Sequence, residues 1–223
     1  MPTSYLIAGI SPTGDVSINF TASLLRFQAD LARASDTVAA FDFFESISTA
    51  IDHFHRDASF DVLVLIDAGM AIDPVFFIEY DSTKPFVVGV YPLGKIDWAR
   101  VEKKIGLACT EDASKIGNIY SIDPRKGSIQ GRYIVVKTAG LGIVKLGRCV
   151  LDEIIAKHGT KVLSKDGKLV LHAAGIENGT AMSADERLCH LWGGNIYADT
   201  KYHTKSSGPV AFSGCVGTRT KLR

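Results

Sequence analysis

One carboxylate stands where a ligand is expected to bind. The segment FDVLVLIDAG, residues 60–69, is almost continuously apolar and β-branched until it reaches Asp67. Such a run is typical of a central parallel strand that is buried on both faces. Because ligands of open α/β sheets bind at the carboxyl ends of the strands, Asp67 is predicted to face a binding site. The alternative is that Asp67 caps the turn or helix that begins at AIDP, residues 71–74.

Other residue types that often perform chemistry lack the spacing for it. The four cysteines lie far apart without a CxxC pair, which argues against a zinc knuckle or a disulfide framework. His53 and His55 alternate on a predicted helix and therefore do not share a face. His158, His172 and His190 have no carboxylate or cysteine at ligand spacing, so packed or solvated imidazoles are expected.

The spacing of apolar residues predicts the elements that position Asp67. Strands are expected at 5–10, 37–41, 60–69 and 84–92, with helices at 20–31, 45–56 and 96–105. Residues 114–131 are expected to form a hairpin-rich surface region, and residues 131–159 a strand, glycine turn, strand and helix. Short β pieces, a compact segment SADERLCHLWGG and a strand NIYAD follow. This order predicts one α/β domain over residues 1–223 with a mostly parallel sheet.

Composition excludes several classes of partner. The chain has 223 residues, 46% of them hydrophobic, with 25 basic and 24 acidic side chains and a net charge of +1. Nucleic acid and anionic membranes are therefore not expected as partners. No apolar run approaches ~18 residues and the N-terminus has no basic signal region, so neither a membrane span nor a secretory signal is predicted. A cytoplasmic location is expected, in the host cytoplasm for a viral chain.

Four segments carry a resemblance that spans nearly the whole chain. They are FDVLVLIDAGMAIDP at 60–74, KPFVVGVYPLGKIDWARV at 84–101, TAGLGIVKLGRCVLDEI at 138–154 and SADERLCHLWGGNIYAD at 183–199. In this order and spacing they resemble compact nucleotide-sugar glycosyltransferases of the GT-A fold, found in large algal viruses, phages and bacteria. The resemblance implies a Rossmann-like sheet flanked by helices and a small mixed or antiparallel β portion in the C-terminal half. Residues 1–100 would form the nucleotide-binding half and residues 101–223 the acceptor half.

The resemblance implies a donor site around Asp67. Asp67 matches the first Asp of the family's Asp-x-Asp motif, which contacts the ribose, and it is the one metal-ligand position of that motif that is kept, because Gly69 replaces the second Asp. Tyr91 and Lys95 match a stretch beside the donor pocket. Lys95 is a candidate to place a positive charge at the pyrophosphate, and a solvated lysine is the alternative. The loop at Pro12 and the helix that follows it are expected to complete the donor site.

The resemblance places the chemistry in the C-terminal half. Asp185 falls on the family's catalytic carboxylate, which in inverting members removes the proton of the acceptor hydroxyl. Gly140 and Gly142 match the lining of the sugar and acceptor pocket, where a missing side chain lets backbone approach a ligand. Trp192 is a candidate to stack on a sugar ring. The alternatives are a β-bulge for the glycines and ordinary packing for the tryptophan.

Two positions that hold Mn²⁺ or Mg²⁺ in the family carry no matching ligand here. They are Gly69, in place of Asp, and Ser206, in place of His. A glycine offers a hard cation only its backbone carbonyl, and Asp73 would substitute only if its loop folded back. The pattern indicates either metal-independent transfer or loss of catalysis. Without a metal, Arg132 or Arg148 would have to offset the charge on the leaving phosphate.

These expectations combine into one leading hypothesis and two alternatives. The leading hypothesis is transfer of a sugar from a UDP- or GDP-linked donor to a hydroxyl of a glycan or polysaccharide. The first alternative is a catalytically inactive relative that binds a sugar or nucleotide, or serves in assembly. The second is a nucleotidyltransferase or another Rossmann-like enzyme, which is weakened because no Gly-rich phosphate loop follows the first strand.

Overall fold

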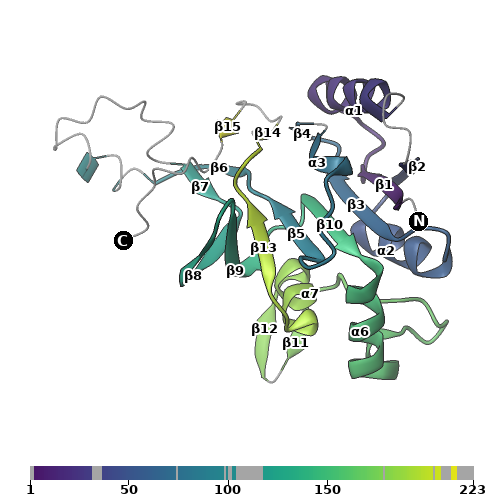
Figure 1. The fold of residues 1–223 in the computed structure, drawn as a ribbon. Coiled ribbons are helices and arrows are strands. Elements are labelled where there is room, and N and C mark those ends of the chain that lie inside the picture. The colour runs from purple at the N-terminus through teal and green to yellow at the C-terminus, as the bar shows by residue number, and fades with distance from the viewer. Residues whose placement is uncertain are drawn as a thin grey trace.

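The chain builds an eight-stranded central sheet with helices on both faces (Figure 1). The computed structural model describes residues 3–31, 37–73, 75–97, 99, 102–103, 118–177, 179–202, 204–206 and 212–214. The strand order is β2-β1-β3-β10-β5-β13-β9-β8. The bounds are β1 Ser4–Ile10, β2 Val38–Phe44, β3 Val62–Asp67, β5 Phe86–Gly89, β8 Ile122–Gln130, β9 Tyr133–Ala139, β10 Ile143–Gly147 and β13 Ile196–Asp199.

The sheet is mixed, and the mostly parallel sheet expected from the sequence is not confirmed. Neighbours are parallel at β2–β1, β1–β3 and β5–β13, and antiparallel at β3–β10, β10–β5, β13–β9 and β9–β8. β10 is buried along its whole length. A strand buried on both faces has the same continuous apolar pattern in either direction, so its sequence does not reveal that it runs against β3 and β5.

Five α-helices and one 3-10 helix are present in the described residues. Helices α2, α6 and α7 cover one face of the sheet, and α1 and α3 the other (Figure 1). Strand β3 serves both layers, because Leu63 and Leu65 face the first while Val64 and Ile66 face the second. The bounds are α1 Ile18–Leu31, α2 Ile47–Arg56, α3 Val75–Ile78, α6 Arg148–His158, η1 Gly159–Val162 and α7 Ala184–Trp192.

Helices α2 and α7 begin at capping boxes. Ser46 accepts the N–H of Thr49 at the start of α2, and Ser183 accepts the N–H of Glu186 at the start of α7. In each pair the side chain of the later residue accepts the N–H of the cap in return. These reciprocal bonds satisfy N–H groups that have no partner inside a helix, which fixes where each helix starts. The compact segment expected at SADERLCHLWGG is therefore a helix.

Short strands form small antiparallel sheets beside the central one. β4 pairs with β14, β14 with β15, β6 with β7, and β11 with β12. Of the short β pieces expected over residues 161–175, the described residues show a bridge between Leu163 and Leu169 and the start of β11 at Gly175. Of the helix expected at 96–105, the described residues Ala99, Glu102 and Lys103 are helical, whereas Ile96 ends β6. The bounds are β4 Met70–Ile72, β6 Pro92–Ile96, β7 Asn118–Tyr120, β11 Gly175–Glu177, β12 Thr180–Met182, β14 Thr204–Ser206 and β15 Phe212–Gly214.

A group of buried and partly buried charged side chains lies on the face covered by α1 and α3. The Glu79 carboxylate accepts from Arg132 Nη1 at 2.7 Å and from the Tyr202 hydroxyl at 2.5 Å. Lys145, 2% exposed, donates to the main-chain carbonyl of Glu79. Asp199, 1% exposed, forms a 3.2 Å ion pair with Arg132 that lacks hydrogen-bond alignment. Burial lowers the pKa of Lys145 to about 8 and raises that of Asp199.

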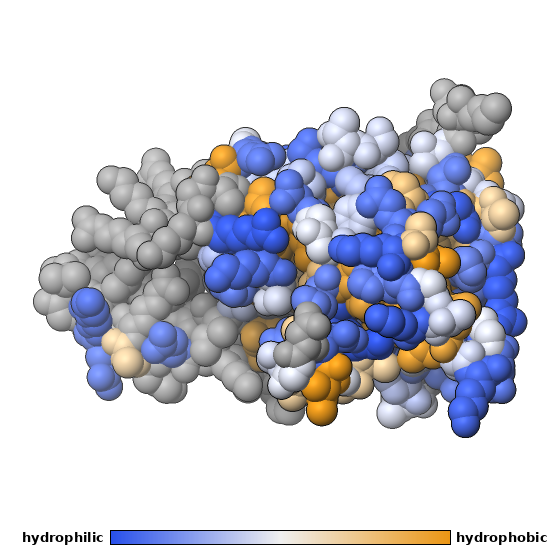
Figure 2. Space-filling view, turned by 90° about the horizontal axis from the view of Figure 1, so that it is seen from below, coloured by the Kyte–Doolittle hydropathy of each residue, from blue (hydrophilic) through white to orange (hydrophobic). Residues whose placement is uncertain are grey.

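No helix in the described part of the chain is both long and apolar enough to cross a membrane. Seen from below the orientation of Figure 1, the described surface is mainly hydrophilic, with hydrophobic residues in small groups between hydrophilic ones (Figure 2).

Candidate functional site

Asp67 closes β3 at a corner where three chain segments meet. It pairs in register with Ile10, the last residue of β1, and its main-chain N–H donates to the carbonyl of Gly142 at 2.8 Å. Its Oδ1 accepts the N–H of Gly69 at 2.7 Å, so Asp67 caps the turn at residues 68–69 and not one that begins at residues 71–74. Oδ2 has no hydrogen-bond partner among the described residues. One carboxylate oxygen is thus engaged by the turn, and the other remains available to a ligand.

The loop after β1 is joined to the Asp67 turn by main-chain bonds. The N–H of Ala68 donates to the carbonyl of Ile10, and the N–H of Ser17 donates to the carbonyl of Ala68, each at 2.9 Å. Ser17 also caps the first turn of α1 by accepting the N–H of Phe20 at 3.1 Å. Pro12 is exposed on this loop. The structure therefore brings the amino end of α1 next to the Asp67 turn, and Pro12 lies on the loop that joins β1 to α1.

Tyr91 occupies the space beside the two predicted pocket glycines. It follows β5, is buried, and its hydroxyl accepts the N–H of Gly142 at 3.2 Å. A Cβ added to Gly140 would lie 2.4 Å from the Tyr91 hydroxyl, and one added to Gly142 would lie 2.8 Å from Met70 Cε. Both glycines are thus explained by contact with protein side chains, which the sequence did not reveal.

The negative charges of both predicted carboxylates affect the Tyr91 hydroxyl. Its pKa is raised to about 12, mainly by burial, with smaller contributions from the charges of Asp185 and Asp67. Tyr91 is therefore a neutral phenol near pH 7. Tyr91, Asp67 and Asp185 come from separate sequence segments, and all three hydrogen-bond to the main chain of residues 141–142.

Asp185 lies in the first turn of α7 with both carboxylate oxygens engaged. Oδ2 accepts the N–H of Leu141 at 3.2 Å, and Oδ1 lies 2.7 Å from Nε2 of His172. An ionised carboxylate only accepts hydrogen bonds, so we assign the imidazole proton to Nε2. The Asp185 side chain is 37% exposed, which leaves lone pairs of its oxygens open to an incoming hydroxyl group.

His172 is the site residue that the sequence missed. The expectation that it has no carboxylate partner is wrong, because the partner lies thirteen residues away across a folded loop. That loop is held to α2, since Ser48 Oγ donates to the carbonyl of His172 at 2.6 Å and the N–H of Leu169 donates to Asp52 Oδ1 at 2.9 Å. No local spacing rule predicts a contact that depends on such tertiary anchoring.

Trp192 and Lys95 are not brought into this group of contacts by the described structure. Trp192 is at the opposite end of α7 from Asp185, about 10 Å along the helix axis. Its Nε1 donates to the carbonyl of Asn195 at 3.2 Å, and its ring packs against the core. Lys95 belongs to β6, but its side chain lies outside the described part of the chain.

Arg148 and Arg132 have structural partners away from Asp67. The Arg148 guanidinium donates to the carbonyls of Phe54, Asp57 and Phe60. Phe60 precedes β3, so Arg148 is at the opposite end of that strand from Asp67. Arg132 belongs to the charged group with Glu79 described above. The expectation that either arginine offsets charge on a leaving phosphate is therefore not supported.

The two positions matched to a family metal site do come together. Ser206 of β14 pairs in register with Met70, the residue after Gly69. Asp73 does not fold back toward them, because its Oδ1 accepts the N–H of Val75 at the start of α3. Within the described residues, no three His, Cys, Asp or Glu side chains gather as a metal site would require. One carboxylate with one oxygen already engaged is too few to hold Mn²⁺ or Mg²⁺ by protein ligands alone, so the residues do not fit a resident cation.

Comparisons with known proteins leave the family open. No protein-family model matches the chain. No curated protein matches it either. Among solved structures, the crystal structure of A197 from STIV is similar at 16% identity and a TM-score of 0.47, covering 92% of this chain and 85% of that chain. The function therefore rests on the geometry of the site.

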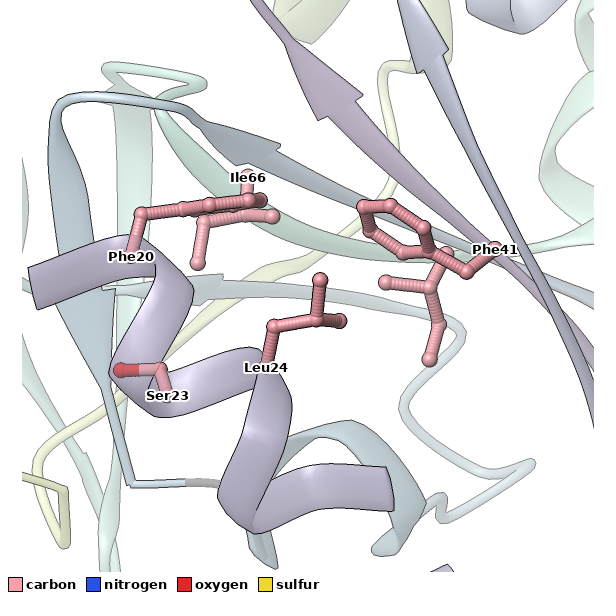
Figure 3. A pocket seen from close by; sticks show the side chains of 6 residues that line it. Phe20, Ser23, Leu24, Phe41 and Ile66 are labelled. Carbon is pink, nitrogen blue, oxygen red and sulfur yellow. The ribbon is translucent and has the colours of Figure 1, made fainter. Parts of the chain in front are cut away.

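A hollow under α1 is an apolar packing gap. Side chains from α1, β1, β2 and β3 line it, and it has no interior space for a water molecule (Figure 3). Its one polar side chain, Ser23, donates to the main-chain carbonyl of Asn19 at 3.0 Å. It offers nothing to hold a nucleotide or a sugar. The lining residues are Ile7, Phe20, Ser23, Leu24, Phe41 and Ile66.

Proposed function

We propose that this chain is a glycosyltransferase of the GT-A type, which transfers a sugar from a nucleoside-diphosphate sugar to a glycan hydroxyl. The observation that carries the proposal is convergence. Asp67, Tyr91, Gly142 and Asp185 were selected from four separate sequence segments, and they meet at the main chain of residues 141–142. Asp67 and Tyr91 hydrogen-bond to Gly142, and Asp185 hydrogen-bonds to the neighbouring Leu141.

The sheet and a second pairing support the same proposal. β3 and β5 run in the same direction, because each is antiparallel to β10 between them. The carboxyl ends of β1, β3 and β5 therefore lie at the same end of the sheet, where ligands of open α/β sheets usually bind. The pairing of Ser206 with Met70 also joins the two positions that the GT-A resemblance assigns to one metal site. We extend the proposal on these grounds to a Rossmann-like, nucleotide-binding GT-A sheet.

In the proposed reaction, Asp185 is the base of a direct displacement. Its exposed carboxylate takes the proton of the acceptor hydroxyl while that oxygen forms a bond to the anomeric carbon of the donor. The bond from the anomeric carbon to the phosphate oxygen breaks, and the nucleoside diphosphate leaves with the electron pair. Asp67 Oδ2 accepts from the ribose of the donor. The amino end of α1 faces the negative pyrophosphate.

A sugar- or nucleotide-binding module without turnover is the second candidate. Both oxygens of Asp185 already have hydrogen-bond donors, Leu141 and His172. The same arrangement would serve a carboxylate that only joins α7 to the chain before β10. The two candidates share the donor site and differ in whether Asp185 removes a proton.

Donor binding and turnover test the two candidates together. Calorimetric titration with UDP- and GDP-sugars is expected to show binding to the wild-type chain, and Asp67→Ala is expected to weaken it. Release of UDP or GDP in the presence of glycan acceptors measures turnover. In an enzyme, Asp185→Asn keeps donor affinity and loses about 10²–10⁴-fold in kcat. Asp152→Asn, on an exposed position of α6, is the matched control. Absence of binding by every nucleotide sugar refutes the proposal, and binding without turnover favours the module.

A further inference from the structure

The segment that carries His172 is clamped between two helices. On one side, Ser48 and Asp52 of α2 hold the carbonyl of His172 and the N–H of Leu169. On the other side, Arg187 of α7 donates to the carbonyl of Val170 at 3.0 Å. A loop with anchors on both flanks has little freedom to move its side chains. The anchored main chain therefore holds the imidazole of His172 next to Asp185.

Arg187 adds a second link between this segment and the helix of Asp185. Its Nε donates to Glu177 Oε1 at 2.8 Å, and the pair is partly buried, with side chains 14% and 27% exposed. Arg187 is two residues after Asp185 on α7. The carboxylate and the segment that holds its partner are therefore tied to the same helical turn, which fixes their separation.

The two hydrogen bonds to Asp185 set the orientation of its carboxylate. His172 holds Oδ1 and the Leu141 N–H holds Oδ2, so rotation of the carboxylate plane would break both bonds. Each oxygen of an ionised carboxylate has two lone pairs, and one remains on each oxygen. The His172 side chain is 18% exposed and Asp185 37%, so the carboxylate is the more accessible member of the pair. Its accessibility favours the carboxylate as the group that meets a substrate.

We propose that His172 is the positioning residue of Asp185, and this inference rests on the proposed glycosyltransferase function. The Nε2–H holds one oxygen so that the free lone pairs face the acceptor hydroxyl. The imidazole itself does not take the proton in the reaction. Partners that orient a reacting group typically contribute 10–100-fold, and we expect a contribution of about that size here.

Three histidine variants test this role through the split between kcat and KM. His172→Phe keeps a ring without a donor, and His172→Gln keeps a side-chain N–H donor. His190→Gln is the matched control, because His190 is exposed on α7, the helix that carries Asp185. We expect His172→Phe to lower kcat by about 10–100-fold with donor KM changed less than about twofold, and His172→Gln to recover most of the loss. Should the Phe variant not fold, His172→Asn, whose amide is too short to reach Asp185, replaces it.

A spectroscopic signal tests the hydrogen bond on which positioning depends. In histidine-labelled protein, the hydrogen-bonded Nε2–H is expected as a downfield NMR signal that Asp185→Ala removes. A wild-type chain without that signal overturns the inference.

The outcomes for the two proposals are distinct. An active wild type with a full-rate His172→Phe variant refutes the positioning role and leaves the glycosyltransferase in place. A Gln variant as inactive as the Phe variant also overturns positioning, since it assigns the proton transfer to the imidazole. A wild type that binds no nucleotide sugar refutes the proposed function itself.

Discussion

Lys145 is expected to make the free energy of unfolding rise with pH, and replacement of Lys145 by methionine should abolish this dependence. Its ammonium group is 2% exposed, donates to the carbonyl of Glu79 and lies 4.2 Å from the centre of the Phe76 ring. Burial lowers its pKa from 10.5 to about 8. The charged form is therefore disfavoured in the folded chain relative to the unfolded chain.

The size of the effect follows from the two pKa values. A depression from 10.5 to about 8 corresponds to about 3 kcal/mol of native-state penalty when the lysine is charged. Between these values the unfolded chain binds more protons than the folded chain, so the free energy of unfolding rises with pH, by at most about 1.4 kcal/mol per pH unit. The penalty is fully present below the folded pKa of about 8 and disappears as the pH approaches 10.5.

Urea unfolding of the wild type and of Lys145→Met across this range measures the effect. We expect the wild type to gain about 2.5 kcal/mol relative to the variant between pH 7 and pH 10. Comparing the two chains cancels the titration of tyrosines that both share. Lys137→Met, exposed on β9, serves as the control and should follow the wild type. A difference that stays constant within about 0.5 kcal/mol would refute the buried-charge reasoning.

Three further changes probe the core and the site. Gly140→Ala forces the Tyr91 hydroxyl out of a 2.4 Å contact and should cost about 1–3 kcal/mol, measured by urea unfolding; an unchanged midpoint would contradict it. Phe54→Ala, at a fully buried position, should cost about 3–5 kcal/mol in the same assay, and a loss below about 1 kcal/mol would show that α2 packs differently. Ser183→Ala removes the cap of the helix that carries Asp185 and should cost about 1 kcal/mol, with faster amide exchange in the first turn of α7; unaltered exchange would argue against the cap.

The sequence predicted the elements that are decided locally. The buried run before Asp67 is strand β3, and the periodic segment at 45–56 contains α2. A local signal for α7 was present as well, because Ser183 and Glu186 have capping-box spacing, which predicts a helix at that point. Elements of this kind depend on residues close in sequence, so pattern and propensity are enough.

Contacts set by tertiary packing were beyond that reach. The direction of β10 depends on the end of the sheet from which the chain enters between β3 and β5. The apolar pattern of β10 carries no such information. The glycines at 140 and 142 were attributed to a ligand, whereas the Tyr91 hydroxyl occupies the space beside both of them. His172 meets Asp185 only because α2 anchors its loop. Asp67, Tyr91 and Asp185 were thus selected from the sequence, whereas the partner of Asp185, His172, required the fold.

The insertion of β10 between β3 and β5 has a consequence for synthesis on the ribosome. β3 pairs with β1 on one side, but its other side and both sides of β5 lack their sheet neighbours until residues 143–147 emerge. Until then these strands present unpaired main-chain edges, which favour association with other chains. The Asp67 corner is therefore completed late, when the carbonyl of Gly142 arrives to accept the N–H of Asp67.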